Sequence, residues 1–95
     1  MIERHVLFHV RPDKTADFET FFKTQYRPAM STMPGFVSAE LLCRQQSTNW
    51  YMMVIRFTNE ETAAAWRNSD LHKSLSPSLK SLYYESELEV YDVVA

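Results

Sequence analysis

The sequence predicts an α+β domain in which two helical regions cover one face of a four-stranded antiparallel sheet. Four segments rich in apolar and β-branched residues have the character of strands, and two segments repeat apolar residues at intervals of three and four. Their order along the chain is β-α-β-β-α-β, the ferredoxin-like arrangement. Because 95 residues is a usual length for one domain, residues 1–95 are expected to form a single unit.

The first strand is expected at residues 2–11, where Val6 and Phe8 alternate with His5 and His9. Both sets include apolar neighbours, so we expect both faces of this strand to be covered. The sequence leaves open which face carries the two histidines.

A helix is expected from about Thr15 onward, and Pro28 should kink or shorten it because proline lacks the amide of a regular turn. A turn around Gly35 follows. The aromatic and apolar stripe of this helix consists of Phe18, Phe21, Phe22, Tyr26 and Met30.

Residues 36–44 and 50–57 are predicted to form a hairpin across a polar loop. Residues 58–61 match a capping box with Thr58 as the cap, so a second helical region should begin there. Ser69 and Asp70 supply a fresh cap, and Ser76 with Pro77 begins a further turn running towards residue 84. A fourth strand is expected at residues 87–94.

Composition excludes several classes of function. A net charge of −2 gives no broad cationic surface for nucleic acid, and no apolar run approaches the length needed to span a membrane. The single cysteine, Cys43, and the lack of an export segment predict a cytoplasmic protein. Three scattered histidines do not make a metal site, and Gly35, the one glycine, makes no phosphate loop. We therefore expect no metal and no cofactor.

The strands carry apolar side chains on both faces, and residues 52–55 are apolar in succession. Helices can cover only one face of such a sheet. We therefore predict a homodimer in which a second copy covers the other face.

Three segments give the chain a family resemblance. These are Pro34–Phe36 before the second strand, the third strand with its capped turn, and residues 65–72, which are similar to a Trp-x-x-Ser-x-x-His motif. Together they resemble the antibiotic biosynthesis monooxygenase-type domains of the dimeric α/β-barrel superfamily. The opening residues 2–8 also resemble the stress-responsive A/B-barrel proteins of that superfamily.

The resemblance implies a dimeric α/β barrel and several possible functions, since a fold alone does not choose among them. The first is a cofactor-independent monooxygenase that oxidises a phenolic, quinol or polyketide-like aromatic with O2 in a cavity between helices and sheet. The alternative is a non-enzymatic dimeric barrel that binds a small hydrophobic metabolite or has a stress-related role. Haem degradation ranks lower, because the axial histidine of haem-degrading members would fall at Ser76.

His72 is the first candidate for acid-base catalysis, since it follows a cap and an imidazole titrates near neutral pH. It is also compatible with a capping role or a subunit contact. Trp66 is the candidate wall for a flat substrate, although aromatic residues at helical spacing are usually core. His5 and His9 are second-rank catalytic candidates.

The remaining candidates concern substrate binding. Aromatic side chains would line the pocket and asparagine amides would donate hydrogen bonds to a substrate oxygen. This set comprises Tyr51, Phe22, Tyr26, Asn49 and Asn68. Arg56, flanked by apolar residues, is expected to pair with a carboxylate such as Asp92 or Glu40.

Overall fold

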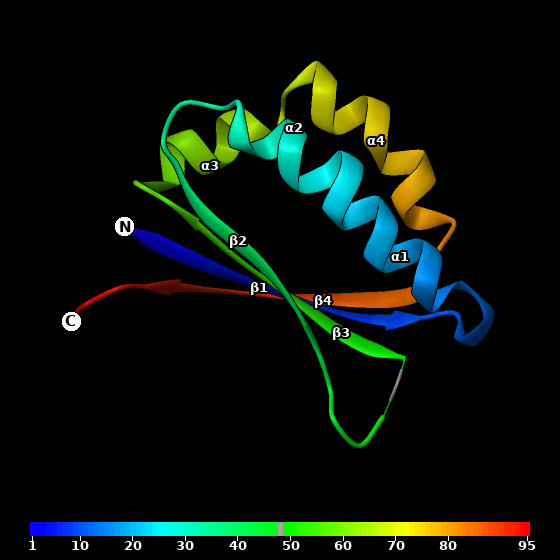
Figure 1. The fold of residues 1–95 in the computed structure, drawn as a ribbon. Helices are drawn as coiled ribbons and strands as arrows, with labels where there is room; N and C mark the ends of the chain where they lie inside the picture. Colours follow the sequence, from blue (N-terminus) through cyan, green and yellow to red (C-terminus); the bar gives the residue numbers. More distant parts are fainter. Residues whose placement is uncertain (48) are drawn as a thin grey trace.

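The computed structural model describes residues 1–47 and 49–95 and confirms the α+β prediction. Four antiparallel strands form one sheet in the order β2-β3-β1-β4, and all the helices lie on one side of it (Figure 1). The strands are β1 (Ile2–Val10), β2 (Phe36–Cys43), β3 (Trp50–Phe57) and β4 (Tyr83–Asp92). The central pair, β1 and β3, brings residues from both halves of the chain together.

The first helical region continues past Pro28 instead of ending there. A 3-10 turn, η1 (Pro12–Lys14), leads into α1 (Thr15–Phe21), a π-helical turn η2 (Phe22–Tyr26) and α2 (Arg27–Ser31). The Arg27 amide donates to the Phe22 carbonyl, five residues back. A proline ring collides with the carbonyl four residues earlier in a regular helix, and this wider turn directly before Pro28 gives it room.

The second helical region is broken once. Helix α3 (Glu60–Arg67) and helix α4 (Asp70–Lys80) meet at a two-residue break, and Pro77 lies inside α4 rather than starting a new turn. The capping box is also one residue later than predicted, because Asn59, not Thr58, accepts from the Thr62 amide at 2.9 Å.

The last strand begins earlier than the sequence suggested. Tyr83 pairs with Val10, so residues 83–86, which were divided between a helical end and a loop, belong to β4. The Leu82 amide donates to Leu79, and the Leu82 carbonyl accepts from the Arg11 amide. These two hydrogen bonds of Leu82 end α4 and lead directly into β4.

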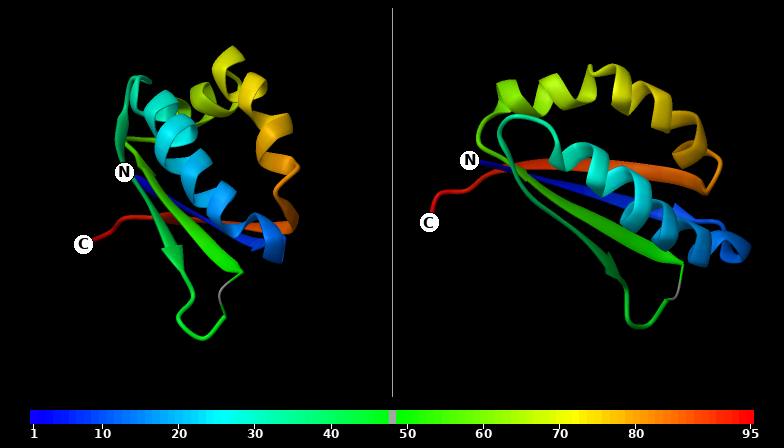
Figure 2. Two further views of the ribbon diagram at one scale, coloured as in Figure 1. Left: turned by 45° about the vertical axis from the view of Figure 1, so that its right-hand side comes forward. Right: turned by 45° about the horizontal axis from the view of Figure 1, so that its top comes forward.

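The two faces of the sheet differ sharply in burial. Along β3, buried and partly exposed residues alternate without exception. The helices all lie over the same side of the sheet (Figure 2). The buried residues of β3 belong to one core cluster with the aromatic stripe of the first helical region. We call the other side the open face; its central residues are Glu3, His5, Leu7 and His9 of β1 and Trp50, Met52, Val54 and Arg56 of β3.

Gly35 fixes the turn into β2 against the start of α3. Its φ is 82°, a conformation that favours glycine. A Cβ at this position would lie 2.5 Å from the Thr62 side chain. The Gly35 carbonyl also accepts from the Thr58 amide at 2.8 Å, so this turn positions the first residues of α3.

Within the described residues, no helix combines the length and apolar character that crossing a membrane would require.

Candidate active site

A cavity of about 250 Å³ lies between the sheet and the second helical region. Side chains from β1, β3 and β4 form its floor, and α3, α4 and η2 supply its walls. The lining residues are Arg4, Val6, Phe8, Tyr26, Met53, Ile55, Trp66, Arg67, His72, Ser76, Leu79, Lys80, Tyr83, Ser86 and Leu88. Most of the floor is apolar, which suits a flat hydrophobic ligand.

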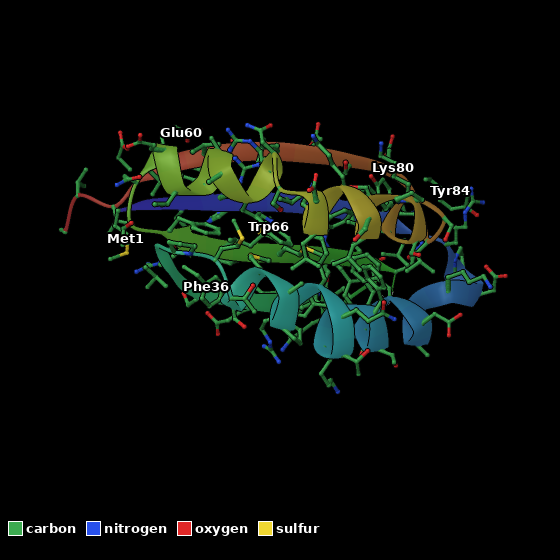
Figure 3. All side chains as sticks on the ribbon, turned by 90° about the horizontal axis from the view of Figure 1, so that it is seen from above. Met1, Phe36, Glu60, Trp66, Lys80 and Tyr84 are labelled. Carbon is green, nitrogen blue, oxygen red and sulfur yellow. The ribbon has the colours of Figure 1, made fainter. Side chains whose placement is uncertain are left out.

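Trp66, His72 and Tyr26 form one aromatic cluster at the wall of this cavity. The ring centroids of Trp66 and His72 are 5.1 Å apart with an interplanar angle of 83°, and those of Tyr26 and Trp66 are 5.6 Å apart at 76°. Trp66 is 3% exposed and lies between the two helical regions (Figure 3). Trp66 is therefore a core residue that also lines the cavity.

Ser69 connects Trp66 with His72 at the break between α3 and α4. Its hydroxyl donates to the Trp66 carbonyl at 2.7 Å and accepts from the His72 amide at 3.1 Å. The serine thus closes one helix and caps the next. This geometry explains the spacing of the three residues, because one side chain holds both neighbouring backbones.

The cavity is electropositive around His72. Burial lowers the pKa of the His72 imidazole below its ordinary value, and the charges of Arg4, Arg67 and Lys80 lower it further. All three cations line the same cavity, and no acidic side chain is among its described lining residues. The imidazole is therefore neutral at neutral pH, with a lone pair available to accept a proton.

Arg67 is only partly satisfied. Its Nη2 donates to Glu60 Oε1 at 2.7 Å, while its Nη1 is buried without an acceptor among the described residues. Burial is also the main reason for the lowered pKa of Arg4, followed by repulsion from Arg67. Arg4 forms no ion pair within the described part of the chain.

Tyr26 completes the cluster as a neutral phenol. Burial raises the pKa of the Tyr26 hydroxyl, and this effect exceeds the opposing influence of a hydrogen bond with Trp66 and of the Arg4 charge. Tyr26 therefore presents an uncharged ring and hydroxyl to the cavity.

Comparison with protein-family models identifies the chain. Residues 1–76 match the model named antibiotic biosynthesis monooxygenase. The chain belongs to the antibiotic biosynthesis monooxygenase family. The matched residues include the three-residue connection of Trp66, Ser69 and His72, and end at the middle of α4. A comparison with curated proteins gave no significant match.

Solved structures share the fold of this family member at low identity. SnoaB, a cofactor-independent oxygenase from Streptomyces nogalater, is 20% identical with a TM-score of 0.89, covering 99% of this chain and 93% of its own. A structure assigned to the same family from Nitrosomonas europaea is 16% identical with a TM-score of 0.87, and both chains are fully covered. A conserved protein from Methanosarcina mazei is 19% identical with a TM-score of 0.85, covering 95% of this chain and 89% of its own.

Two of the predicted binding residues lie in a separate pocket of this family member. Tyr51 and Phe22 line a pocket of about 210 Å³ between the first helical region and β2. The Tyr51 hydroxyl donates to Glu19 Oε2 at 2.5 Å. Burial raises the pKa of the Tyr51 hydroxyl, and the neighbouring Glu19 carboxylate raises it further. Tyr51 and Phe22 are therefore not brought together with His72.

His5 and His9 lie on the open face, on the opposite side of the sheet from the cavity. Side chains alternate along a strand, so the cavity residues of β1 are the even-numbered ones. His5 Nε2 lies 2.6 Å from Glu3 Oε2, and the His9 ring stacks on Trp50 at 4.3 Å. His5 and His9 therefore do not line the cavity that contains His72.

Arg56 also lies on the open face, and its partner differs from the predicted ones. Arg56 Nε donates to Glu3 Oε1 at 2.6 Å, whereas Asp92 and Glu40 were expected. Glu3 is directly opposite Arg56 in the β1–β3 register, which brings the two side chains together. The pKa of Glu3 is lowered, first by the hydrogen bond with His5 and then by that with Arg56.

The two candidate asparagines are outside the cavity lining. Asn49 bridges the hairpin to β1, with its Nδ2 donating to the Val10 carbonyl at 3.3 Å. Asn68 is the exposed C-cap of α3, where its amide donates to the Ala64 carbonyl. Both residues have structural roles in the backbone around them.

The sequence interpretation missed the cationic side of the site. Arg4 and Arg67 were not proposed, nor was Lys80. A signal for Arg4 was present, because it lies in phase with the apolar residues Ile2, Val6 and Phe8 of the same strand. For Arg67 and Lys80, helical spacing alone does not show which side chains reach a cavity.

Within the described residues, no group of three His, Cys, Asp or Glu side chains is arranged to hold a metal ion.

Proposed function

We propose that the chain is a cofactor-independent monooxygenase that oxidises a phenolic or quinol-type aromatic to a quinone. The observation that carries the proposal is a neutral imidazole, His72, held against Trp66 at the wall of a largely apolar cavity. Family membership supports the reaction class. The structure of SnoaB, a cofactor-independent oxygenase, supports the same class by analogy of fold.

His72 would act as the general base. It accepts the phenolic proton, and the electron-rich phenolate that forms lies in the field of Arg4, Arg67 and Lys80. The same positive charges that lower the imidazole pKa also lower that of a bound phenol. The field therefore stabilises the phenolate that the transfer forms, and it also makes His72 a weaker base.

The substrate supplies the electrons for the remaining steps. The phenolate gives one electron to O2, and the resulting superoxide joins the ring radical at carbon to form a C–O bond. Protonation gives a hydroperoxide, and loss of water leaves the second carbonyl. The sum is ArH(OH) plus O2 giving a quinone and one water, with one oxygen atom of O2 in each product.

The protein would orient the ring and exclude water. Trp66 and Tyr26 supply aromatic walls, and Phe8 and Met53 supply an apolar floor. Such a cavity holds the reacting carbon in place and protects the radical pair from solvent.

The fold gives no support to haem degradation. Ser76 occupies the position of the axial histidine, and its hydroxyl donates to the His72 carbonyl at 3.0 Å. A serine tied to its own helix is a poor ligand for iron.

Oxygen uptake with a panel of quinols, anthrones and naphthols tests the proposal. We expect one O2 consumed per quinone formed, and a single ¹⁸O atom in the product when ¹⁸O2 is used. Formation of hydrogen peroxide with no label in the product would indicate an oxidase instead. Saturable binding without any oxygen uptake across the panel would favour the binding-protein alternative.

A further inference from the structure

We infer that the cavity selects aromatic ligands that carry a carboxylate, with the acid group bound by Arg67 and Arg4. This inference rests on the proposed function for the aromatic ring and adds the charged group that fixes its orientation. The observations that carry it are the two guanidinium groups that line the cavity and the buried donor of Arg67 that has no acceptor among the described residues.

Arg67 has bonding capacity left over. A guanidinium group is a planar fork with five donors, and Glu60 takes one bond from Nη2. Nη1 is buried and has no acceptor among the described residues. A buried donor without a partner is unfavourable, so an incoming oxygen that accepts from it gains more than a bond on the open surface would.

Arg4 lies in the floor of the same cavity, and its charge is not neutralised by an ion pair within the described residues. Its pKa is lowered by burial and by the repulsion of Arg67, so the two cations are close enough to act on each other. Glu60 opposes this repulsion, and among the described residues its side chain hydrogen-bonds to Arg67 and not to Arg4. Two cations with one carboxylate leave a positive charge that a ligand can neutralise.

The positive charge is accompanied by an aromatic wall. Trp66 precedes Arg67 in α3, and the Tyr26 ring packs edge-on against Trp66. A ring seated on this wall can direct a substituent towards Arg67 while its reactive phenol remains near His72. A phenol is neutral in solution at neutral pH, whereas a carboxylate is already charged, so the carboxylate brings a negative charge to the two guanidinium groups before any proton transfer.

The open face provides the internal comparison. Arg56 there donates to Glu3 at 2.6 Å, and Glu3 also contacts His5. That cation is already neutralised by the protein. The helix-covered face therefore carries the unpaired positive charge of the sheet's two central arginines.

Calorimetric titration with 6-hydroxy-2-naphthoate and its primary amide, performed without oxygen, tests the inference. The two probes share ring and shape but differ in charge. We expect the acid to bind at least about tenfold more tightly than the amide at pH 7, the usual range for a charge-assisted bond to a buried group. Equal affinity for the two probes would overturn the inference.

Substitutions locate the carboxylate. Arg67→Gln should remove most of the preference for the acid, and Arg4→Gln should reduce it. Arg56→Gln is the matched control, because it makes the same change of charge on the open face and should retain the preference. A preference that survives in Arg67→Gln and Arg4→Gln would assign the carboxylate to another group and overturn the inference.

Glu60→Gln is expected to increase affinity, a result that a misfolded variant would not give. This change removes the carboxylate that competes for Arg67, so the acid should bind several-fold more tightly while the amide is unaffected. An unchanged or weaker affinity for the acid would contradict the role of Arg67.

The outcome separates this inference from the proposed function. A preference for the acid with no oxygen uptake by any quinol would leave the anion site intact and overturn the monooxygenase proposal. Turnover of neutral quinols with the same KM as their carboxylated analogues would overturn the anion site and leave the monooxygenase proposal intact.

Discussion

Arginine and histidine side chains lie on both sides of the sheet, but their polar partners differ. On the open face, Arg56 and His5 are both satisfied by Glu3. On the helix-covered face, His72 lies among cations and Arg67 keeps a buried donor without an acceptor in the described residues. Protein groups thus complete the polar interactions of one face and leave those of the other incomplete.

Residue type alone therefore does not locate the reactive groups in this fold. Three histidines are present, and strand periodicity places two of them on the satisfied side. Unsatisfied polar groups within an apolar cavity are unfavourable for stability unless a ligand completes them. The comparison between the faces can be tested by changes made in parallel on each side.

The largest effect is expected from His72→Asn. Removing the general base should lower kcat by roughly 10²-fold or more with the best quinol substrate, while the fold is retained. His9→Asn is the matched change on the open face and should leave kcat within a small factor of the wild type. Stopped-flow or oxygen-electrode rates measure both. Equal rates for His72→Asn and the wild type would remove His72 from the mechanism.

The pH dependence of kcat is expected to follow His72. Burial and three cations lower the pKa of the His72 imidazole. The rate should therefore not change with pH above pH 6.5, the ordinary pKa of histidine. Below the lowered pKa it should fall about tenfold per pH unit. A midpoint above 6.5 would contradict the electropositive environment, and His72→Asn should lack this acidic limb.

The same group should affect stability in a defined window. The unfolded chain holds the His72 proton more readily than the folded chain, so stability falls as pH decreases from 6.5 to the lowered folded pKa. Glu3 acts separately: its lowered pKa adds stability above 4.5 that is lost as pH falls further. Urea unfolding of His72→Asn and Glu3→Gln across pH should separate the two windows.

A smaller effect is expected at the connection between α3 and α4. Ser69→Ala should cost about 1 kcal/mol of unfolding free energy, the usual value of an N-cap, and should also reduce kcat/KM because Trp66 and His72 lose their common anchor. Asn59→Ala removes the other N-cap at similar cost and should leave kcat/KM unchanged. Identical kinetic effects of the two variants would reduce Ser69 to a stabilising cap.

The last prediction concerns assembly, for which we expect a twofold difference in molecular mass. Light scattering at micromolar concentration should give a mass near twice the 11.2 kDa of one chain. Leu42, half-exposed on the open face, gives the test of the surface involved. Leu42→Glu should shift the mass towards one chain, and a monomeric wild type would contradict the predicted barrel.

Periodicity and capping predicted most of the fold, since helix and strand repeats are local properties of the chain. The errors lie at boundaries. Pro28 was expected to disturb its helix, yet a wider turn accommodates it, and residues 83–86 joined β4 because pairing with β1 outweighs local helical preference. Such outcomes depend on contacts between distant segments.

The site was predictable where residues are close in sequence. Trp66 and His72 lie within one short segment across the helix break, and the resemblance of residues 65–72 to a family motif pointed to both of them. Whether His5 and His9 face the cavity depends on which side of the sheet the helices cover. Which pocket Tyr51 and Phe22 line depends on how the helices divide the space above the sheet. Those placements are properties of the assembled fold.

Gly35 extends the sensitivity of the cavity to a turn that does not line it. Any side chain there would meet Thr62 at the start of α3, and Thr62 lies one helical turn before Trp66 on the same side of that helix. Displacement at the turn would therefore be transmitted along α3 to the aromatic wall. A mutational scan for ligand affinity should find that substitutions of Gly35 weaken binding, although Gly35 does not line the cavity.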